Sequence, residues 1–348
     1  MFSILRPYIF NLDPEVAHDL VIKSLKFNFI PKSFFQVENE EILMTELFKK
    51  KLKNPIGLAA GFDKSAEVYN SLFKFGFGFV EVGTVTPKRQ FGNSKPRVFR
   101  LEKDKAMINR LGFNNDGIEI VSERLNKNIP DGILGVNIGP NKGTKEKISD
   151  FIECFSKLNK FANYITVNIS SPNTAGLRDF HEEKLLSGLL SKLLEIKKKQ
   201  KITCPIALKL SPDIGESEIS NINEMVVKFK IDGLILTNTT NQNRDNLVDP
   251  RKNETGGLSG LPLQKLSLKF IKTFFKLNKG KLPLIGVGGI DSGQSAFEKI
   301  AAGATAIQLY TGMVYKGPGV VKDIKKELIE ILKKEKIKNI QEAVGINS

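Results

Sequence analysis

The sequence contains few of the residues on which metal sites and disulfide frameworks depend. Among its 348 residues are two cysteines, two histidines and no tryptophan. Cys154 and Cys204 have neither the spacing of a zinc site nor that of a disulfide framework, which favours a reducing compartment. His18 and His181 are not spaced with cysteine or acidic partners, so we expect no metal ion.

Three longer patterns are also missing. No run of about 18 or more apolar residues exists, so we expect no segment that spans a membrane. Residues 1–7 lack the long apolar core and the small-residue cleavage site of a signal peptide. No Gly-x-Gly-x-x-Gly opens a helix after an early strand, so a bound nicotinamide dinucleotide is not indicated.

What the chain has in excess is positive charge. Its formal net charge is +15, which is typical of many proteins that bind nucleic acid. The lysines are, however, spread along the whole chain, and heavy use of Lys, Asn, Ile and Phe is typical of an AT-rich genome. We therefore expect no nucleic-acid partner, and a mild attraction to anionic lipid instead.

Eight short apolar runs alternate with helix-like segments. The runs read as buried parallel strands and span residues 54–61, 79–86, 133–139, 164–170, 205–211, 233–239, 282–290 and 306–311. Helix-like segments include 64–75, 148–162, 182–199, 216–229, 263–277 and 293–302. This alternation predicts an α/β fold, a (β/α)8 TIM barrel over residues 46–340, with a small helical extension over residues 1–45.

The extension begins with a clear helix start. Asp13 is suited to cap a helix, and Pro14 is suited to its first position. An apolar stripe then follows, formed by Ala17, Leu20, Val21, Ser24 and Leu25, with Phe27, Phe29 and Ile30 beyond it. A second short helix is expected from Pro31 through Phe34 and Phe35. Such a helix either braces the end of the barrel or dips an apolar face into a bilayer.

Polar residues and glycines stand where the predicted strands end. In a barrel of parallel strands this end carries the chemistry. The loop 168–178 crowds hydroxyls and amides there, and the excursion 87–115 is too long for a simple connection. Lys209 lies within an apolar strand, where a charge is costly unless it faces a site. Glycine clusters at 256–260, 286–289 and 312 predict a phosphate site, which suits flavin mononucleotide (FMN).

From residue 11 to residue 325 the chain resembles the dihydroorotate dehydrogenases, flavin enzymes of pyrimidine synthesis. The most specific segments are 60–64, 109–115, 168–178 and 310–319. Ser171 stands at the position of the catalytic base, where the quinone-linked, membrane-associated class has serine and the soluble class has cysteine. The helical extension is likewise a feature of the quinone-linked class.

The resemblance implies a role for each matching residue. FMN contacts are expected from Ala60, Gly61, Phe62, Asp63, Lys64, Thr84, Asn137, Asn168, Lys209, Thr237, Gly260, Gly289, Tyr310 and Thr311. Substrate contacts are expected from Lys64, Asn109, Arg110, Leu111, Gly112, Phe113, Asn168, Asn173, Asn238 and Thr239. Quinone contacts are expected from His18, Arg100 and Tyr310.

The implied reaction is oxidation of (S)-dihydroorotate to orotate. Ser171 would take the C5 proton, helped by Thr174 through a water and by Phe113, which shapes the pocket, while a hydride passes from C6 to the flavin. A membrane quinone would then reoxidise the flavin. The resemblance further implies a monomer held peripherally on the membrane, on the cytoplasmic side of the cell membrane if the protein is bacterial.

Three other functions remain open from the residues. The first is a related pyrimidine reductase or a soluble dehydrogenase that uses fumarate or nicotinamide, which Ser171 and the extension count against. The second is an RNA-modifying flavin barrel, which would account for the charge of +15 but would need a separate RNA-binding module. The third is a barrel that has lost its activity, which the intact polar strand ends disfavour.

Overall fold

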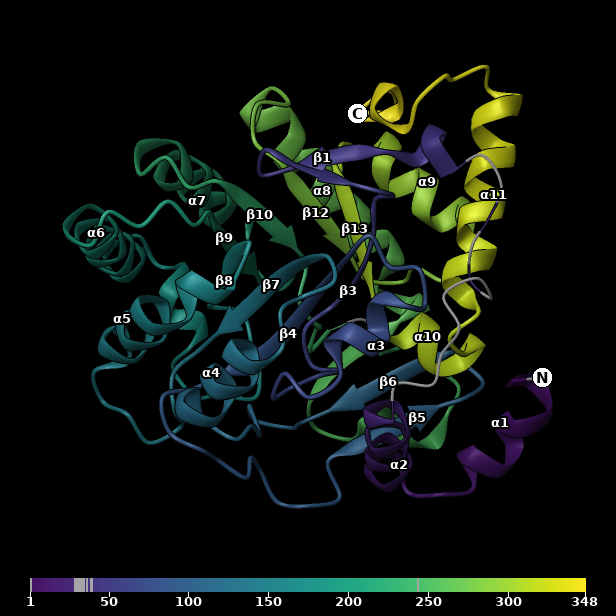
Figure 1. Ribbon diagram of the computed structural model, residues 1–348, viewed down its shortest axis with the longest axis horizontal. Helices are drawn as coiled ribbons and strands as arrows, with labels where there is room; N and C mark the ends of the chain where they lie inside the picture. The colour runs from purple at the N-terminus through teal and green to yellow at the C-terminus, as the bar shows by residue number, and fades with distance from the viewer. Residues whose placement is uncertain (1, 28–34, 36, 38–39, 243) are drawn as a thin grey trace.

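The computed structural model describes every residue except 1, 28–34, 36, 38–39 and 243, and eight of its strands close into a parallel barrel (Figure 1). Around the barrel the strand order is β10-β12-β13-β3-β4-β7-β8-β9. The strands are Ile56–Leu58 (β3), Phe79–Val85 (β4), Ile133–Ile138 (β7), Tyr164–Asn168 (β8), Ile206–Leu210 (β9), Gly233–Leu236 (β10), Leu284–Val287 (β12) and Ala306–Leu309 (β13). Each lies within one predicted run, and the predicted barrel is confirmed.

Helices surround this barrel (Figure 1). They are Tyr69–Phe73 (α3), Ile118–Lys127 (α4), Lys147–Leu158 (α5), Glu183–Lys199 (α6), Glu216–Lys228 (α7), Gln264–Asn278 (α8), Gly293–Ala301 (α9), Thr311–Lys316 (α10) and Val320–Lys334 (α11). Short 3-10 turns lie at Glu40–Leu43, Asn159–Phe161, Arg178–His181, Pro250–Asn253, Leu261–Leu263 and Ile340–Ala343. The prediction of a helix over 64–75 was wrong in extent, because only α3 is α-helical there.

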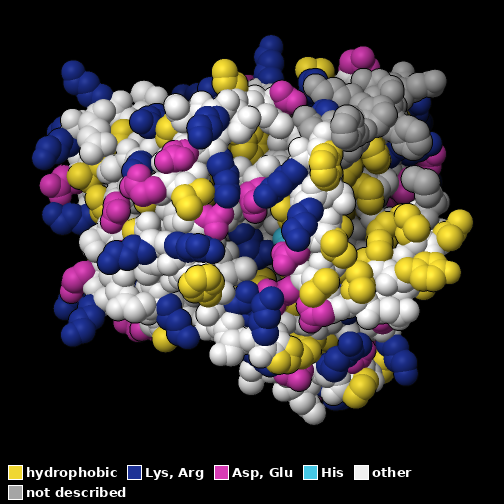
Figure 2. All heavy atoms as spheres, turned by 60° about the horizontal axis from the view of Figure 1, so that its bottom comes forward, with side chains coloured by type: hydrophobic (Ala, Val, Ile, Leu, Met, Phe, Trp, Pro, Cys, Tyr) yellow, Lys and Arg dark blue, Asp and Glu magenta, His cyan; other side chains and the backbone are white. Residues whose placement is uncertain are grey.

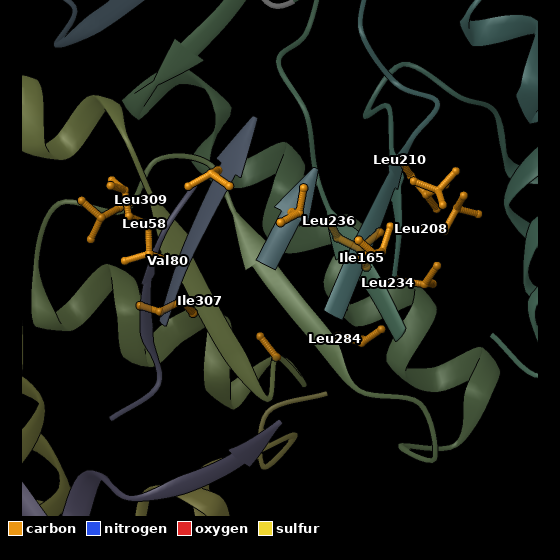
Figure 3. Close-up of a cluster of buried hydrophobic side chains, with 14 of the residues drawn as sticks. Leu58, Val80, Ile165, Leu208, Leu210, Leu234, Leu236, Leu284, Ile307 and Leu309 are labelled. Carbon is orange, nitrogen blue, oxygen red and sulfur yellow. The ribbon is translucent and has the colours of Figure 1, made fainter. Parts of the chain in front are cut away.

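Successive side chains of each barrel strand point alternately toward the surrounding helices and into the barrel interior. In β9, Leu208 and Leu210 pack with the helix-facing core, whereas Ala207 lies in the barrel interior. Leucine, isoleucine and valine side chains of all eight barrel strands share the helix-facing layer, and Figure 3 labels Leu58, Val80, Ile165, Leu208, Leu210, Leu234, Leu236, Leu284, Ile307 and Leu309 among them. By this alternation Lys209 points into the barrel, where it lines a cavity.

The amino end of the barrel is filled by large side chains. A hairpin of Thr45–Leu47 (β1) and Lys50–Leu52 (β2) contributes Leu47 and Leu52 to a cluster with Phe79 and Tyr164, which begin their own strands. Gly135 makes room for the tyrosine ring, since a Cβ there would lie 2.2 Å from Tyr164 Cζ. These side chains fill the barrel interior at this end, whereas the cavity lined by Lys209 lies at the carboxyl ends of the strands.

At the carboxyl end, the excursion 87–115 folds into more than a loop. It contains Val98–Leu101 (β5) and Ala106–Asn109 (β6), which join Gly257–Gly260 (β11) in an antiparallel sheet of order β11-β6-β5. The sequence had indicated a long functional loop over 87–115 and a glycine-rich approach to a phosphate at 256–260. The sheet fixes both segments against each other over the strand ends.

The amino-terminal extension contains two helices, Phe2–Phe10 (α1) and Pro14–Lys26 (α2). The predicted start of α2 is confirmed, since Asp13 Oδ1 accepts the backbone N–H groups of Glu15 and Val16 at 2.9 and 3.1 Å. Helix α1, which contains Pro7, was not predicted. The expected second helix from Pro31 lies outside the described residues, apart from Phe35, and so do Phe29 and Ile30.

The predicted apolar stripe of α2 is divided between two faces. Ala17, Ile22 and Leu25 are buried, whereas Leu20 and Val21 are exposed, so a single stripe was wrong. Exposed apolar side chains of α1, of α2 and of the residues next to these helices form an apolar face, which gathers on the right of Figure 2 and consists of Ile4, Leu5, Tyr8, Leu12, Val16, Leu20, Val21 and Phe27. Among the described residues no helix is both long and apolar enough to cross a membrane.

Candidate active site

One cavity of about 670 Å³ extends from the carboxyl ends of the barrel strands to α1 and α2. Most residues that the sequence singled out line it, although they come from segments far apart in the chain. They are His18, Ala60, Gly61, Phe62, Lys64, Thr84, Arg100, Asn109, Leu111, Gly112, Phe113, Asn168, Ser171, Asn173, Lys209, Thr237, Asn238, Thr239, Gly260, Gly289, Tyr310 and Thr311.

Four of the predicted site residues do not line this cavity: Asp63, Arg110, Asn137 and Thr174. Asp63 is buried and accepts the N–H groups of Glu67 and Val68, which bends the loop after β3 and delays α3. The Arg110 guanidinium turns away to the carboxylate of Glu254, with Nη1 2.7 Å from Oε2. The side chains of Asp63 and Arg110 therefore shape the site without facing it.

Asn137 lies in a polar network beneath the cavity, where it organises two residues that do face it. Its Oδ1 accepts Thr84 Oγ1 at 2.6 Å and Asn168 Nδ2 at 3.2 Å. Its own Nδ2 donates to Glu81 Oε1 at 2.8 Å. Glu81 was not predicted as a site residue, yet its fully buried carboxylate anchors this network.

Glu81 accepts hydrogen bonds from three further strand residues inside the barrel. Tyr164 and Gln308 each donate to Oε2 at 2.9 Å, and Thr166 donates at 3.0 Å. The Lys209 ammonium is buried close by. Burial lowers the pKa of Lys209, and the negative charge of Glu81 counteracts the shift. No hydrogen bond or ion pair of Lys209 is present among the described residues, so its ammonium is available to a ligand in the cavity.

The loop that carries Ser171 is held in place by hydrogen bonds within the loop and by Arg178. Ser171 Oγ accepts the N–H of Asn173 at 3.2 Å. Arg178 donates to the carbonyl oxygens of Ser170 and Thr239 at 3.3 and 3.2 Å and pairs with Asp213 at 2.9 Å. Arg178 thus ties the serine loop to the segments that follow β9 and β10, a positioning role that the sequence did not reveal.

The segment 109–113 closes over the same cavity. Asn173 Nδ2 donates to the carbonyl oxygen of Asn109 at 3.1 Å, which joins this segment to the serine loop. Gln90 Nε2 donates to the carbonyl oxygens of Gly112 and Phe113 at 3.2 and 3.1 Å. Asn109, Asn173, Asn238 and Thr239 therefore surround one polar space beside Ser171.

Glycines line the wall formed by β11 and by the loops after β12 and β13. Gly260, Gly288 and Gly289 face the cavity together with Tyr310 and Thr311. Each of the three glycines has a positive φ, between 72° and 112°, which residues with a Cβ rarely adopt. This wall offers close approach to backbone N–H groups, as a phosphate requires.

Toward α1 and α2 the lining becomes aromatic. Phe62 packs edge-on against His18 and Tyr310, with ring centroids 5.1 and 5.9 Å apart. Arg100 lies over the Phe10 ring at 4.6 Å and donates to the carbonyl oxygens of Phe10 and Leu12 at 3.0 Å. The three predicted quinone contacts thus lie along this arm of the cavity.

His18 and Lys64 lie next to each other in the lining of this cavity. Lys64 Nζ lies 3.3 Å from His18 Nε2. Burial, and then the nearby Lys64 charge, lower the pKa of His18 to about 3. Burial lowers the pKa of Lys64 to about 8, against the attraction of Glu15. Near neutral pH, His18 is therefore uncharged and Lys64 is a cation that can meet an anionic ligand.

At its strand ends this α/β barrel brings together a glycine-lined wall, a serine loop and a buried lysine that has no partner among the described residues, which is the architecture of a barrel enzyme. A family model described as dihydroorotate dehydrogenase matches residues 42–332. The chain belongs to the dihydroorotate dehydrogenase family.

Relatives named dihydroorotate dehydrogenase (quinone) span nearly the whole chain. The Christiangramia forsetii protein is 46% identical over 339 residues, covering 94% of this chain and 98% of the relative. The mitochondrial protein of Mus musculus is 43% identical, covering 97% and 87%. The crystal structure of the Eimeria tenella enzyme in complex with ferulenol superposes with a TM-score of 0.91 at 39% identity, covering 96% of each chain. These relatives identify the chain as an oxidoreductase of the quinone-linked type.

Proposed function

We propose that this protein oxidises (S)-dihydroorotate to orotate in pyrimidine synthesis, with FMN as hydride acceptor and a membrane quinone as final electron acceptor. The observation that carries the proposal is the single cavity that joins Ser171 and the amide cluster to the aromatic arm under α1 and α2. One flavin between them can serve a polar substrate on one side and an apolar oxidant on the other.

The residues present fit FMN. The Lys209 ammonium is buried, faces the cavity and has no partner among the described residues. A Cβ on Gly61 would meet no atom within 4 Å, so this position leaves free space that a flat ring can occupy. Gly260, Gly289 and Thr311 would hold the phosphate. When bound, the flavin supplies hydride acceptance from the substrate and electron delivery to the quinone.

Lys209 and the amide network would orient the flavin and stabilise it. A buried cation beside the ring favours the negative charge that reduction adds, because the site excludes water. Thr84 and Asn168 are fixed by Asn137, which is itself fixed by Glu81. These side chains therefore hold their hydrogen-bonding groups in place before the ligand arrives.

Ser171 is the proposed base for the C5 proton. The N–H of Asn173, 3.2 Å from Ser171 Oγ, would stabilise the negative charge that develops on that oxygen as the serine hydroxyl gives up its own proton, and the oxygen would then accept the C5 proton. Thr174 lies on the same loop, outside the cavity lining, and its role would be to pass the proton on through a water. Phe113 lines the cavity and would shield the reacting carbon from bulk solvent.

The substrate would be held by charge at one end and amides at the other. Lys64 is the cation for its carboxylate, and Asn109, Asn173, Asn238 and Thr239 would pair with the N–H and C=O groups of its ring. Bidentate amide contacts discriminate strongly against analogues that lack those groups.

The quinone would enter beneath α1 and α2 and approach His18, Arg100 and Tyr310. Burial raises the pKa of Tyr310 to about 12, so this hydroxyl keeps its proton near neutral pH. The exposed apolar face supports peripheral binding of the extension, residues 1–45, to a membrane, while the barrel, residues 46–340, remains in the aqueous phase. We propose that the protein acts as a monomer on the cytoplasmic face of a bacterial cell membrane.

The proposal is tested by comparing electron acceptors. We expect dihydroorotate to yield orotate with a soluble quinone, and little orotate with fumarate or NAD⁺. A preference for fumarate or NAD⁺ would assign the protein to the soluble type despite Ser171. Failure to oxidise dihydroorotate with any acceptor would refute the proposed function.

A further inference from the structure

A buried ion pair joins α2 to the excursion 87–115. Arg97 Nε donates to both carboxylate oxygens of Glu15 at 3.1 and 3.0 Å, and Nη2 donates to Oε1 at 2.9 Å. Only 6% of the Arg97 side chain and 14% of the Glu15 side chain are exposed. A buried pair with several hydrogen bonds fixes geometry far better than an exposed one.

The third nitrogen of Arg97 continues this connection toward the substrate side. Nη1 donates to the carbonyl oxygens of Phe91 and Asn93 at 2.6 and 2.7 Å. The backbone of Arg97 also accepts the N–H of Arg110 at 2.8 Å. The position of Glu15 on α2 therefore determines where the loop around Asn93 lies.

Asn93 in turn contacts both walls of the proposed substrate site. Its Nδ2 donates to the carbonyl oxygens of Arg110 and Asn173 at 2.9 and 3.4 Å. Its backbone N–H donates to the carbonyl oxygen of Leu111 at 3.0 Å. The N–H of Asn173 reaches Ser171 Oγ. An unbroken chain of hydrogen bonds and short covalent segments thus runs from α2 to the proposed base.

We propose that Glu15 is a positioning residue for dihydroorotate oxidation, which holds the segment 109–113 and the serine loop in place through Arg97 and Asn93. The proposal rests on the proposed function. It assigns the extension a second task beyond quinone access, since loosening α2 would loosen the substrate site on the far side of the cavity.

The experiment measures orotate binding to the oxidised holoenzyme from the change in its flavin spectrum, a readout that does not depend on turnover. The variants are Glu15→Gln, Arg97→Met and the double variant. We expect orotate binding to weaken on the order of tenfold in each single variant and no further in the double, because residues in one network are not additive. The rate of flavin reduction by dihydroorotate should fall in parallel.

The matched control is Lys26→Met. Lys26 also pairs α2 with the barrel, through Glu67, but at the opposite end of the helix from Glu15. This variant should leave orotate binding within about twofold of the wild type, as expected for a partly exposed pair. An equal loss in Lys26→Met would show that any weakening of α2 has the same effect and would overturn the proposal.

Glu15 also attracts Lys64, so Glu15→Gln could weaken orotate binding through Lys64 instead of through Arg97. The double variant distinguishes these two routes. If Glu15→Gln weakened orotate binding further in the Arg97→Met background, the effect would pass through Lys64 and the proposal would be wrong. Unchanged orotate binding in both single variants would also refute it. Should Arg97→Met lose FMN, the milder Asn93→Ser tests the same connection. A wild-type holoenzyme whose flavin does not respond to orotate would instead refute the proposed function.

Discussion

Removing the carboxylate of Glu81 should destabilise the protein severely, although Glu81 does not line the cavity. Its side chain is 0% exposed and accepts hydrogen bonds from Asn137, Tyr164, Thr166 and Gln308. The substitution Glu81→Met keeps the length of the side chain and removes both acceptor oxygens.

The magnitude follows from what the network loses. The hydroxyls of Tyr164 and Thr166 can rotate, whereas Asn137 Nδ2 loses its acceptor, at a cost of about 1–3 kcal/mol for a buried donor. Lys209 also loses the acidic group that supports its charge in the barrel. Removing one member of a buried charge pair lowers the free energy of unfolding by about 3–5 kcal/mol. We use this range as the total effect of Glu81→Met.

The assay is thermal unfolding of the holoenzyme followed by far-ultraviolet circular dichroism, because the chain has no tryptophan to report by fluorescence. We expect Glu81→Met to lower Tm by on the order of 5–15 °C and Glu81→Gln, which keeps one acceptor, to lower it less. Adding Lys209→Met to Glu81→Met should recover part of the loss. A Tm within about 2 °C of the wild type for Glu81→Met would refute this reasoning.

Three further predictions concern the site and the extension. Ser171→Ala should keep FMN but slow flavin reduction by dihydroorotate by roughly 10²–10⁴-fold in anaerobic stopped-flow measurements, and a near-normal rate would remove Ser171 from the base role. Orotate binding should be constant below pH 8 and weaken above it, because Lys64, with its pKa lowered by burial to about 8, loses its charge there; Lys64→Met should bind weakly at every pH, and an unchanged pH profile in that variant would contradict the assignment. Leu20→Glu should reduce co-sedimentation with lipid vesicles, since 48% of Leu20 is exposed on the apolar face; undiminished binding would place the membrane contact elsewhere.

The barrel could be predicted because its strands are buried on both faces, which produces continuous apolar runs that the alternating helices separate. The strand ends could be predicted for the same reason, since a polar residue directly after such a run must lie at the carboxyl edge. Lys209 was identified as a charge within an apolar strand. Glu81, within Phe79–Val85, carries the same signal, and applying that criterion to every strand would have found it.

Other parts of the site depend on contacts that no local pattern contains. Glu15 and Arg97 are 82 residues apart in the chain, and neither stands in a context that predicts the other. Helix α2 is apolar on two sides, so the sequence alone did not decide which side packs on the barrel. The loop after β3 resembled a helix in its pattern, but the Asp63 carboxylate stabilises a turn there instead.

The first measurement to make is anaerobic visible spectroscopy of the purified holoenzyme, with dihydroorotate added first and a soluble quinone second. We predict a flavin band that bleaches with dihydroorotate and returns with quinone. Bleaching without return would contradict the quinone assignment. A flavin that does not respond to dihydroorotate, or the absence of any flavin, would contradict the central claim that this cavity joins the two half-reactions.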